Sequence, residues 1–236
     1  MTSLLKKGWS KVSSAGTKVY NSFWGDFGES SPESIEGASR GGPSTSSGFT
    51  YKRHDDIAME ISVYGVDLGN SCSHVSVARG GGFECVLDDL TGKRTCPTMV
   101  SFVQKERHIG DKAETQAIRN WRNTARSAKR LLGLPYDSAQ AAHERRFLQC
   151  NTRRADDGGF EFVLQMQGKE EAFSPEQILA MVLKKLHHMA HGEAQRTNSK
   201  PTGRLHSVLS VPVWYTAGQR ERMWDVAAIA GVDCLG

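Results

Sequence analysis

The chain has 236 residues, enough for one large domain or two small ones. Charged residues make up 24% of it and hydrophobic residues 38%, and no apolar run approaches the roughly 18 residues of a membrane span, so we expect no transmembrane helix. The net charge of +4 is mild, and we expect no nucleic-acid partner.

The five cysteines are Cys72, Cys85, Cys96, Cys150 and Cys234, and no two of them form a C-x-x-C pair. An odd count without that spacing predicts free thiols in a reducing compartment, in place of a disulfide framework or a zinc site. We therefore expect a cytoplasmic protein.

Residues 1–25 have the pattern of a basic amphipathic helix, and no acidic residue precedes Asp26. On a helical wheel the apolar side chains share one face and the lysines the other. The apolar residues are Leu5, Trp9, Val12, Val19, Tyr20 and Phe23, and the lysines are Lys7, Lys11 and Lys18. A disordered tail, a membrane-surface helix at residues 4–24 and a mitochondrial presequence are the competing interpretations. The last two would place the protein peripherally on a membrane or in mitochondria.

Residues 26–56 are predicted to form a disordered linker. Between Gly28 and Thr50, 16 of 23 residues are Gly, Pro, Ser or Thr. Such a composition buries too little apolar surface to offset the entropy lost on ordering. The folded body is therefore expected at residues 57–236.

The first part of the folded body, up to residue 173, is predicted to form mainly strands. Apolar and polar residues alternate, with many Val, Ile and Tyr, which is typical of strands with one buried face. Strands are expected at residues 59–69, 72–80 and 83–90, short helices at 111–120 and 123–133, and a hairpin at 160–173 that turns at Gly168.

The second half adds the strongest helix signal of the sequence, at residues 174–196. Ser174 is placed to cap this helix, Pro175 is suited to its first position, and Gln177 completes a capping box. A strand at 205–212 and a helix at 217–230, closed by Gly231, complete the order of elements. Strands followed by alternating helices and strands predict an α/β or α+β domain with a mixed sheet.

Asp67 ends the first predicted strand and leads into a glycine-containing turn. Gly69, Asn70, Ser71 and Ser73 form the predicted turn into the second strand. Such a turn can direct several backbone N–H groups at one anion, and a neighbouring carboxylate can hold a hydrated magnesium ion between phosphates. The same residues also suit an ordinary hairpin turn. A G-x-x-x-x-G-K-[ST] motif is not present in the sequence.

Five segments, in order, resemble the N-terminal ATPase domain of the seventy-kilodalton heat-shock (DnaK-type) chaperone family. The resemblance runs from Tyr64 to Leu235 and rests on "GVDLGNSCSHVSVA", "GKRTCPTMVSF", "RHIGDKAETQAIRNWRNTARSAKRLLG", "FSPEQILAMVLKKL" and "SVPVWYTAGQRERMWDVAAIAGVDCL". It implies an actin-like (ribonuclease H-like) fold, binding of ATP or ADP with Mg²⁺, and ATP-dependent protein folding in the stress response. It also implies unfolded client proteins, J-domain proteins and exchange factors as partners.

The resemblance assigns roles to individual residues. Asp67 matches the aspartate that orients magnesium through water, and Lys129 matches the lysine that contacts the γ-phosphate and the attacking water. Pro212 and Arg220 match the pair that couples the nucleotide state to the peptide-binding domain. The phosphate-binding set comprises Gly65, Asp67, Gly69, Asn70 and Ser71.

Two departures from the family pattern leave alternatives open. Asn70 replaces a threonine, which is similar to the large exchange-factor branch, so a nucleotide-exchange co-chaperone is the second hypothesis. The given sequence ends at Gly236, where the family continues into a second lobe. We therefore expect the first lobe only, which would be inactive alone as an ATPase. A fragment, an incomplete gene product and a reduced protein with another role are the alternatives, and a non-catalytic interaction module is the third hypothesis.

Two further patterns are interpreted as surface features. His187 and His191 lie four residues apart on a predicted helix, but no third ligand accompanies them, so a solvated helix face is expected over a zinc site. The basic pairs Arg145–Arg146 and Arg153–Arg154 have no aromatic stacking motif beside them, so a nucleic-acid patch is not expected there.

Overall fold

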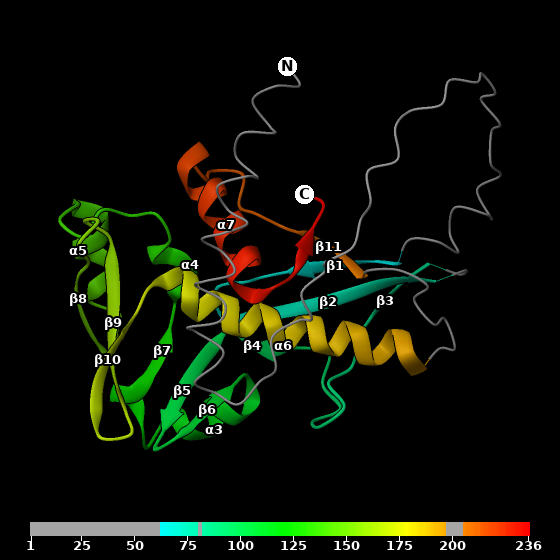
Figure 1. Cartoon of the computed structure of the whole chain (residues 1–236), viewed down its shortest axis with the longest axis horizontal. Coiled ribbons are helices and arrows are strands. Elements are labelled where there is room, and N and C mark those ends of the chain that lie inside the picture. Colours follow the sequence, from blue (N-terminus) through cyan, green and yellow to red (C-terminus); the bar gives the residue numbers. More distant parts are fainter. Residues whose placement is uncertain (1–61, 80–81, 197–204) are drawn as a thin grey trace, which may run out of the picture. The chain divides into compact units, whose positions relative to one another are not determined.

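The computed structural model describes residues 62–79, 82–196 and 205–236 (Figure 1). The predicted amphipathic segment at residues 1–25 and the predicted linker at 26–56 lie outside these residues. Among the described residues, no helix is long and apolar enough to cross a membrane.

The largest sheet has six strands and contains both parallel and antiparallel pairs. Its strands are β1 (Ser62–Asp67), β2 (Cys72–Arg79), β3 (Gly82–Cys85), β4 (Cys96–Pro97), β11 (Leu205–Leu209) and β12 (Asp233–Cys234). The order is β12-β11-β1-β2-β3, and β4 pairs with β2. β1, β2 and β3 pair antiparallel, whereas β1 and β12 each pair parallel with β11. The predicted mixed sheet is therefore confirmed.

The third strand is shorter than the pattern at residues 83–90 predicts. β3 ends at Cys85, and Asp88 folds the chain into a turn by accepting the backbone N–H of Leu90 at 2.9 Å. The same carboxylate also lies 2.6 Å from the Lys185 ammonium. Asp88 fits the alternation of apolar and polar residues that predicted a longer strand. In the structure it lies in a turn after the strand, where the turn and an ion pair satisfy its charge.

Helix α6 (Pro175–Arg196) is the central helix of the described residues. Its capping box forms as predicted: Gln177 N donates to Ser174 Oγ at 3.3 Å, and Ser174 N donates to Gln177 Oε1 at 2.8 Å. α6 packs against β2 and against two other helices, α4 (Ala128–Leu131) and α7 (Ala217–Ala230). In Figure 1 it crosses the main sheet as the long yellow helix. Its middle is fully buried on several sides at Ile178, Leu179, Met181, Val182, Leu183 and Leu186.

Two three-stranded sheets adjoin the main one. The first, in the order β6-β5-β7, contains β5 (Met99–Val103), β6 (Glu106–Ile109) and β7 (Thr124–Arg126). The second, in the order β10-β9-β8, contains β8 (Asn151–Arg154), β9 (Phe160–Met166) and β10 (Lys169–Phe173). The predicted hairpin is confirmed as β9 and β10, and both of its turn residues, Gln167 and Gly168, have positive φ, at 55° and 78°.

Shorter helices connect these sheets. α3 (Asp111–Ala117) confirms the helix predicted at 111–120, and a 3₁₀ turn, η1 (Trp121–Asn123), and α5 (Ala139–Arg145) were not predicted. α7 ends as predicted at Gly231, whose φ is 67°.

The helix predicted at residues 123–133 is wrong over its first part. That part is the strand β7, in which Thr124 and Ala125 are buried and pair with β5. Ser127 then adopts a left-handed conformation with φ 59°, and only α4 is helical. Pairing with a neighbouring strand outweighs the weak local helix preference of this segment.

The five cysteines are free thiols, as predicted. Burial raises the pKa of Cys96 and of Cys150 to about 11, so neither is a reactive thiolate near neutral pH.

Candidate functional site

The candidate site lies where the carboxyl ends of two parallel strands meet. β1 ends at Asp67, and the neighbouring β11 is followed directly by Ser210. Ser210 N donates to Val66 O at 2.9 Å, and Ser210 Oγ donates to Asp67 Oδ1 at 2.8 Å. The carboxylate is thereby oriented at the exposed edge of the sheet, the usual location of ligand sites in α/β proteins.

The turn after Asp67 requires glycine at one position. A Cβ atom on Gly69 would lie 2.0 Å from the carbonyl oxygen of Cys72, a contact that no side chain tolerates. The far side of the turn is anchored to β4, since Thr98 N donates to Ser71 O at 2.8 Å. Ser73 belongs to β2 and not to the turn, and its hydroxyl lies 2.7 Å from that of Thr98. The turn is therefore tight and held in place from both sides.

Lys129 reaches this turn from a different part of the chain. It belongs to α4, and its ammonium donates a hydrogen bond to the carbonyl oxygen of Leu68, 61 residues away in sequence. Burial lowers the pKa of Lys129, and the nearby charge of Asp67 opposes that shift. Only 9% of the residue is exposed, so the ammonium is directed at the turn and away from bulk water.

Tyr215 fixes the backbone that carries this lysine. Its hydroxyl donates to the carbonyl oxygen of Lys129 at 2.7 Å, and burial raises the pKa of Tyr215 to about 12. Tyr215 and Ser210 both lie in the segment that follows β11. That one segment therefore orients Asp67 through Ser210 and holds α4 through Tyr215. Ser210 and Tyr215 were not predicted as site residues. The sequence signal for both was a hydroxyl-bearing side chain at or just after the end of a predicted strand that precedes a predicted helix.

Asn70 provides an unpartnered oxygen in the turn. Its Oδ1 atom is buried and has no hydrogen-bond partner among the described residues. A buried amide oxygen without a partner is costly unless a ligand or water supplies a donor. Together with the Asp67 carboxylate, it is the type of oxygen donor that suits a hydrated Mg²⁺ ion. The residues present therefore fit a magnesium–phosphate group.

Gly65 lies inside β1 and not in the turn. It pairs with Ser76 of β2, and it shares a sheet face with Asp67 because strand residues two apart point the same way. The missing side chain leaves that face open beside the carboxylate. Its predicted role in binding the cofactor stays a prediction.

Pro212 and Arg220, predicted as a coupling pair, lie together. The guanidinium of Arg220 donates to the carbonyl oxygens of Pro212 at 3.4 Å and of Val213 at 3.3 Å. Its Nε donates to the carbonyl oxygen of Tyr215 at 3.3 Å. Arg220 thus ties the start of α7 to the segment that follows β11. The coupling role itself stays a prediction.

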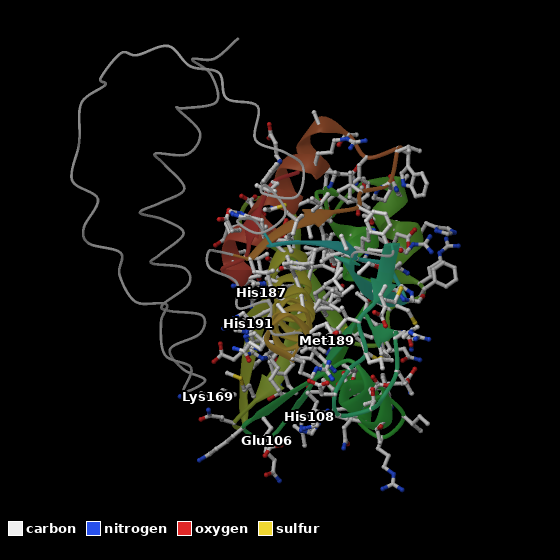
Figure 2. The ribbon with its side chains drawn as sticks, turned by 90° about the vertical axis from the view of Figure 1, so that its right-hand side faces the viewer. Glu106, His108, Lys169, His187, Met189 and His191 are labelled. Atoms are coloured by element: carbon white, nitrogen blue, oxygen red, sulfur yellow. The ribbon has the colours of Figure 1, made fainter. Side chains whose placement is uncertain are left out.

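The histidine pair belongs to a different region. Figure 2 shows His187 and His191 close together on α6, with Glu106 and His108 further away on β6. His187 Nδ1 lies 2.7 Å from the Tyr64 hydroxyl, and burial with neighbouring positive charge lowers the pKa of His187 to about 4. Within the described ranges, no group of three or more His, Cys, Asp or Glu residues could hold a metal ion.

Three of the four arginines in the two basic pairs make internal contacts. Arg153 pairs with Glu161 at 2.7 Å, Arg154 pairs with Asp137 at 3.0 Å, and the Arg145 guanidinium lies 4.3 Å from the ring centroid of Tyr136. These charges are used within the fold, and the expectation of no nucleic-acid partner stays a prediction.

Comparison with known proteins identifies the family. The Hsp70 protein family matches residues 63–236, nearly the whole described part of the chain. The chain belongs to the Hsp70 family. Its mixed α/β architecture is accordingly that of the family's actin-like ATPase domain.

Similar proteins come from the large branch of the Hsp70 family. A heat shock protein homolog of Lachancea kluyveri is 32% identical over 170 residues, 72% of this chain and 24% of that protein. The 97 kDa heat shock protein of Mesocentrotus franciscanus is 34% identical over 175 residues, 74% of this chain and 19% of that protein. The chain thus matches a quarter or less of the length of these relatives.

Proposed function

We propose that the turn at residues 68–71, with Asp67 and Lys129, binds the phosphates of a magnesium nucleotide, and that the protein is an ATP-binding chaperone of the Hsp70 family. The observation that carries this proposal is the contact of the nearly buried Lys129 ammonium with Leu68 O, next to the exposed carboxylate of Asp67. A carboxylate that can hold a cation and an ammonium that can bind phosphate converge on one tight turn.

Each residue has a distinct part in this proposal. The backbone N–H groups of the turn bind phosphate oxygens, and glycine at position 69 permits the tight turn that presents them. Asp67, oriented by Ser210, and the Oδ1 atom of Asn70, which has no hydrogen-bond partner among the described residues, would hold a hydrated magnesium ion. Bound magnesium would neutralise charge on the phosphates, and Lys129 would stabilise the charge that develops on phosphoryl transfer.

The binding test titrates the full chain with magnesium-ADP and magnesium-ATP by isothermal calorimetry. Asp67 and Ser71 are exposed, so their contacts form in a high dielectric, and we expect weak, salt-sensitive binding. Lys129→Met and Asp67→Asn should each weaken binding by about tenfold or more, since a hydrogen bond to a charged group contributes about 1.5–3 kcal/mol. Lys112→Met, an exposed lysine of α3, is the matched control. Equal affinities for all four proteins would contradict the proposal.

A second candidate function is nucleotide exchange on a conventional Hsp70 chaperone. Two observations favour it: the relatives belong to the large branch, and Asn70 offers an amide where the main chaperones carry a threonine hydroxyl. Client proteins and J-domain proteins remain the partners proposed for the first function. The two are distinguished by adding the full chain to a conventional chaperone loaded with labelled ADP. Faster ADP release favours exchange, and peptide-stimulated ATP hydrolysis by the protein itself favours the chaperone function.

A further inference from the structure

A cavity lies away from the candidate nucleotide site. It has a volume of about 860 Å³, and none of the site residues Asp67–Ser71, Lys129 or Ser210 lines it. Its walls come from the segment after α4, the β8–β9 turn, the start of α6 and one face of α7. We call it the α6–α7 groove. Its size suits several side chains of a ligand and greatly exceeds that of a single ion.

The inner part of the groove is apolar. Leu131 and Phe160 are buried to 1% and 3% exposure, and Leu134 and Pro135 lie beside them in the lining. Gly133 and Gly158 adopt positive φ, at 66° and 85°, so the two loops turn sharply at the groove. Leu131, Leu134 and Phe160 therefore form the closed floor of the groove, and the apolar surface offered to a ligand is that of the exposed Pro135.

The remainder of the lining is strongly acidic. Seven carboxylates and two guanidinium groups line the groove, a formal charge of −5 in a chain whose net charge is +4, and Arg153, outside the lining, pairs with one of the seven, Glu161. Among the described residues, no lysine or histidine lines the groove. The carboxylates are those of Asp137, Asp156, Asp157, Glu161, Glu176, Glu221 and Asp225, and the guanidinium groups are those of Arg154 and Arg222.

Several carboxylates of the groove share one guanidinium group, that of Arg222. Arg222 donates a long hydrogen bond of 3.4 Å to Asp157 and lies 3.8 Å from Glu176 and 3.9 Å from Asp225, so one guanidinium faces three carboxylates. Glu176 is nine-tenths buried despite this long contact. Burial raises the pKa of Asp225, with Glu176 and Glu221 adding to the rise against Arg222. Further positive charge would therefore be stabilised here.

We propose that the α6–α7 groove docks a segment of a partner protein that carries arginine or lysine side chains together with apolar ones. The cationic side chains would enter the carboxylate rim, and the apolar ones would cover the exposed Pro135. Charge complementarity selects this occupant over an anion. A bound metal ion is disfavoured because the described residues contain no group of three or more suitable ligands. The proposal is independent of nucleotide binding.

The test uses the full chain and two synthetic peptides, followed by fluorescence anisotropy. One peptide repeats arginine and leucine at helical spacing, and the other has glutamine at every arginine position. The paired substitution Asp156→Asn with Glu221→Gln removes two exposed acids of the rim. We expect binding of the arginine peptide alone, weakened about five- to tenfold by the pair and by added salt.

Two further variants separate the groove from general surface charge. Glu170→Gln with Glu171→Gln removes two exposed acids of β10 that do not line the groove, and it should change the affinity less than about twofold. Gly218→Phe leaves the charge unchanged and adds a ring where a Cβ meets nothing within 4 Å, so it should obstruct the groove and weaken binding. If that variant does not fold, the two charge variants decide.

Three results would overturn the proposal. If both double variants weakened peptide binding equally, the effect would be one of general surface charge. If the variant at Asp156 and Glu221 did not weaken peptide binding, the carboxylates of the rim would not be the binding site. Calcium that binds the chain, competes with the peptide and is lost in that pair would establish a cation site instead. Weakening confined to the rim pair and Gly218→Phe would support a docking groove.

Discussion

Gly69 shows how one residue type decides whether the candidate site can exist. The position lies between Asp67 and Asn70, whose Oδ1 atom has no hydrogen-bond partner within the described part of the chain, and a Cβ atom there would lie 2.0 Å from the Cys72 carbonyl oxygen. Any side chain would push the turn away from β2 and move both neighbours.

The first prediction concerns this glycine. Gly69→Ala should lower the free energy of unfolding by about 1–3 kcal/mol, because the turn must shift to relieve the contact, and nucleotide binding should be lost as well. Gly218→Ala is the matched control, since its Cβ meets nothing within 4 Å and alanine is favoured in a helix by about 1 kcal/mol. Urea unfolding measures both changes. Equal stability of Gly69→Ala and the wild type would contradict the assigned geometry.

The second prediction concerns His187, whose pKa is lowered to about 4 by burial and by the charges of His188, His191 and Lys184. The unfolded chain has the ordinary pKa of about 6.5, so it binds the proton first. This histidine therefore contributes stability above pH 6.5 that is lost as the pH falls towards 4, by about 1–3 kcal/mol after allowance for partial exposure.

The measurement is urea unfolding of the wild type and His187→Gln at several pH values. Carboxylates also titrate in this window, so the difference between the two proteins isolates the histidine. The free energy of unfolding of the wild type should fall relative to that of His187→Gln as the pH is lowered from 6.5 to 4. A difference between the two proteins that stays constant with pH would rule out the assigned pKa shift.

At the scale of elements, α7 connects the candidate site to the groove. Its N-terminus is held by a capping box, in which Gln219 N donates to Thr216 Oγ1 at 3.3 Å and Thr216 N donates to Gln219 Oε1 at 3.1 Å. Gln219 also donates from Nε2 to the carbonyl oxygen of Leu132 at 3.0 Å, just after α4. One side chain therefore caps a helix and fixes the segment that carries Lys129.

The third prediction compares two capping boxes. Gln219→Ala should cost about 1–2 kcal/mol, because it removes half of a capping box and the bond to Leu132 together. Gln177→Ala, in the capping box of α6, removes the side-chain contact with Ser174 and should cost less, about 0.5–1 kcal/mol. Thermal unfolding orders the two variants. A greater loss for Gln177→Ala would show that the bond to Leu132 adds nothing.

At the scale of the whole described unit, α6 is the element that contacts most of the other parts of the fold. It packs against the main sheet, the β5 sheet, α4 and α7, and its middle is buried on several sides. A helix that is apolar on more than one face is stable only inside such surroundings. The three sheets are thereby held as one folded unit from Ser62 to Gly236.

The fourth prediction concerns the boundary of that unit. We predict that residues 57–236 fold together, so limited proteolysis should first cut between Gly28 and Thr50, where Gly, Pro, Ser and Thr dominate. The products are identified by mass spectrometry. A first cut between Ala180 and Met189 of α6 would contradict this, because most of those residues are buried.

The sequence by itself determined the features that depend on neighbouring residues. The capping box at Ser174 and Gln177, the positive-φ turn before β10 and the glycine end of α7 all formed as predicted. The strand that ends at Asp67 and the tight turn after it were predicted as well. Such features involve residues within about four positions, whose backbone preferences are local.

Only the tertiary structure decided which distant residues meet. Lys129 contacts Leu68 across 61 residues, and Ser210 orients Asp67 across 143. Residues 124–126 form a strand because β5 pairs with them, although their neighbours favour helix. The acidic groove likewise combines the β8–β9 turn with α6 and α7. These outcomes depend on strand pairing and core packing between remote segments, and those interactions outweigh local preferences of a few tenths of a kcal/mol per residue.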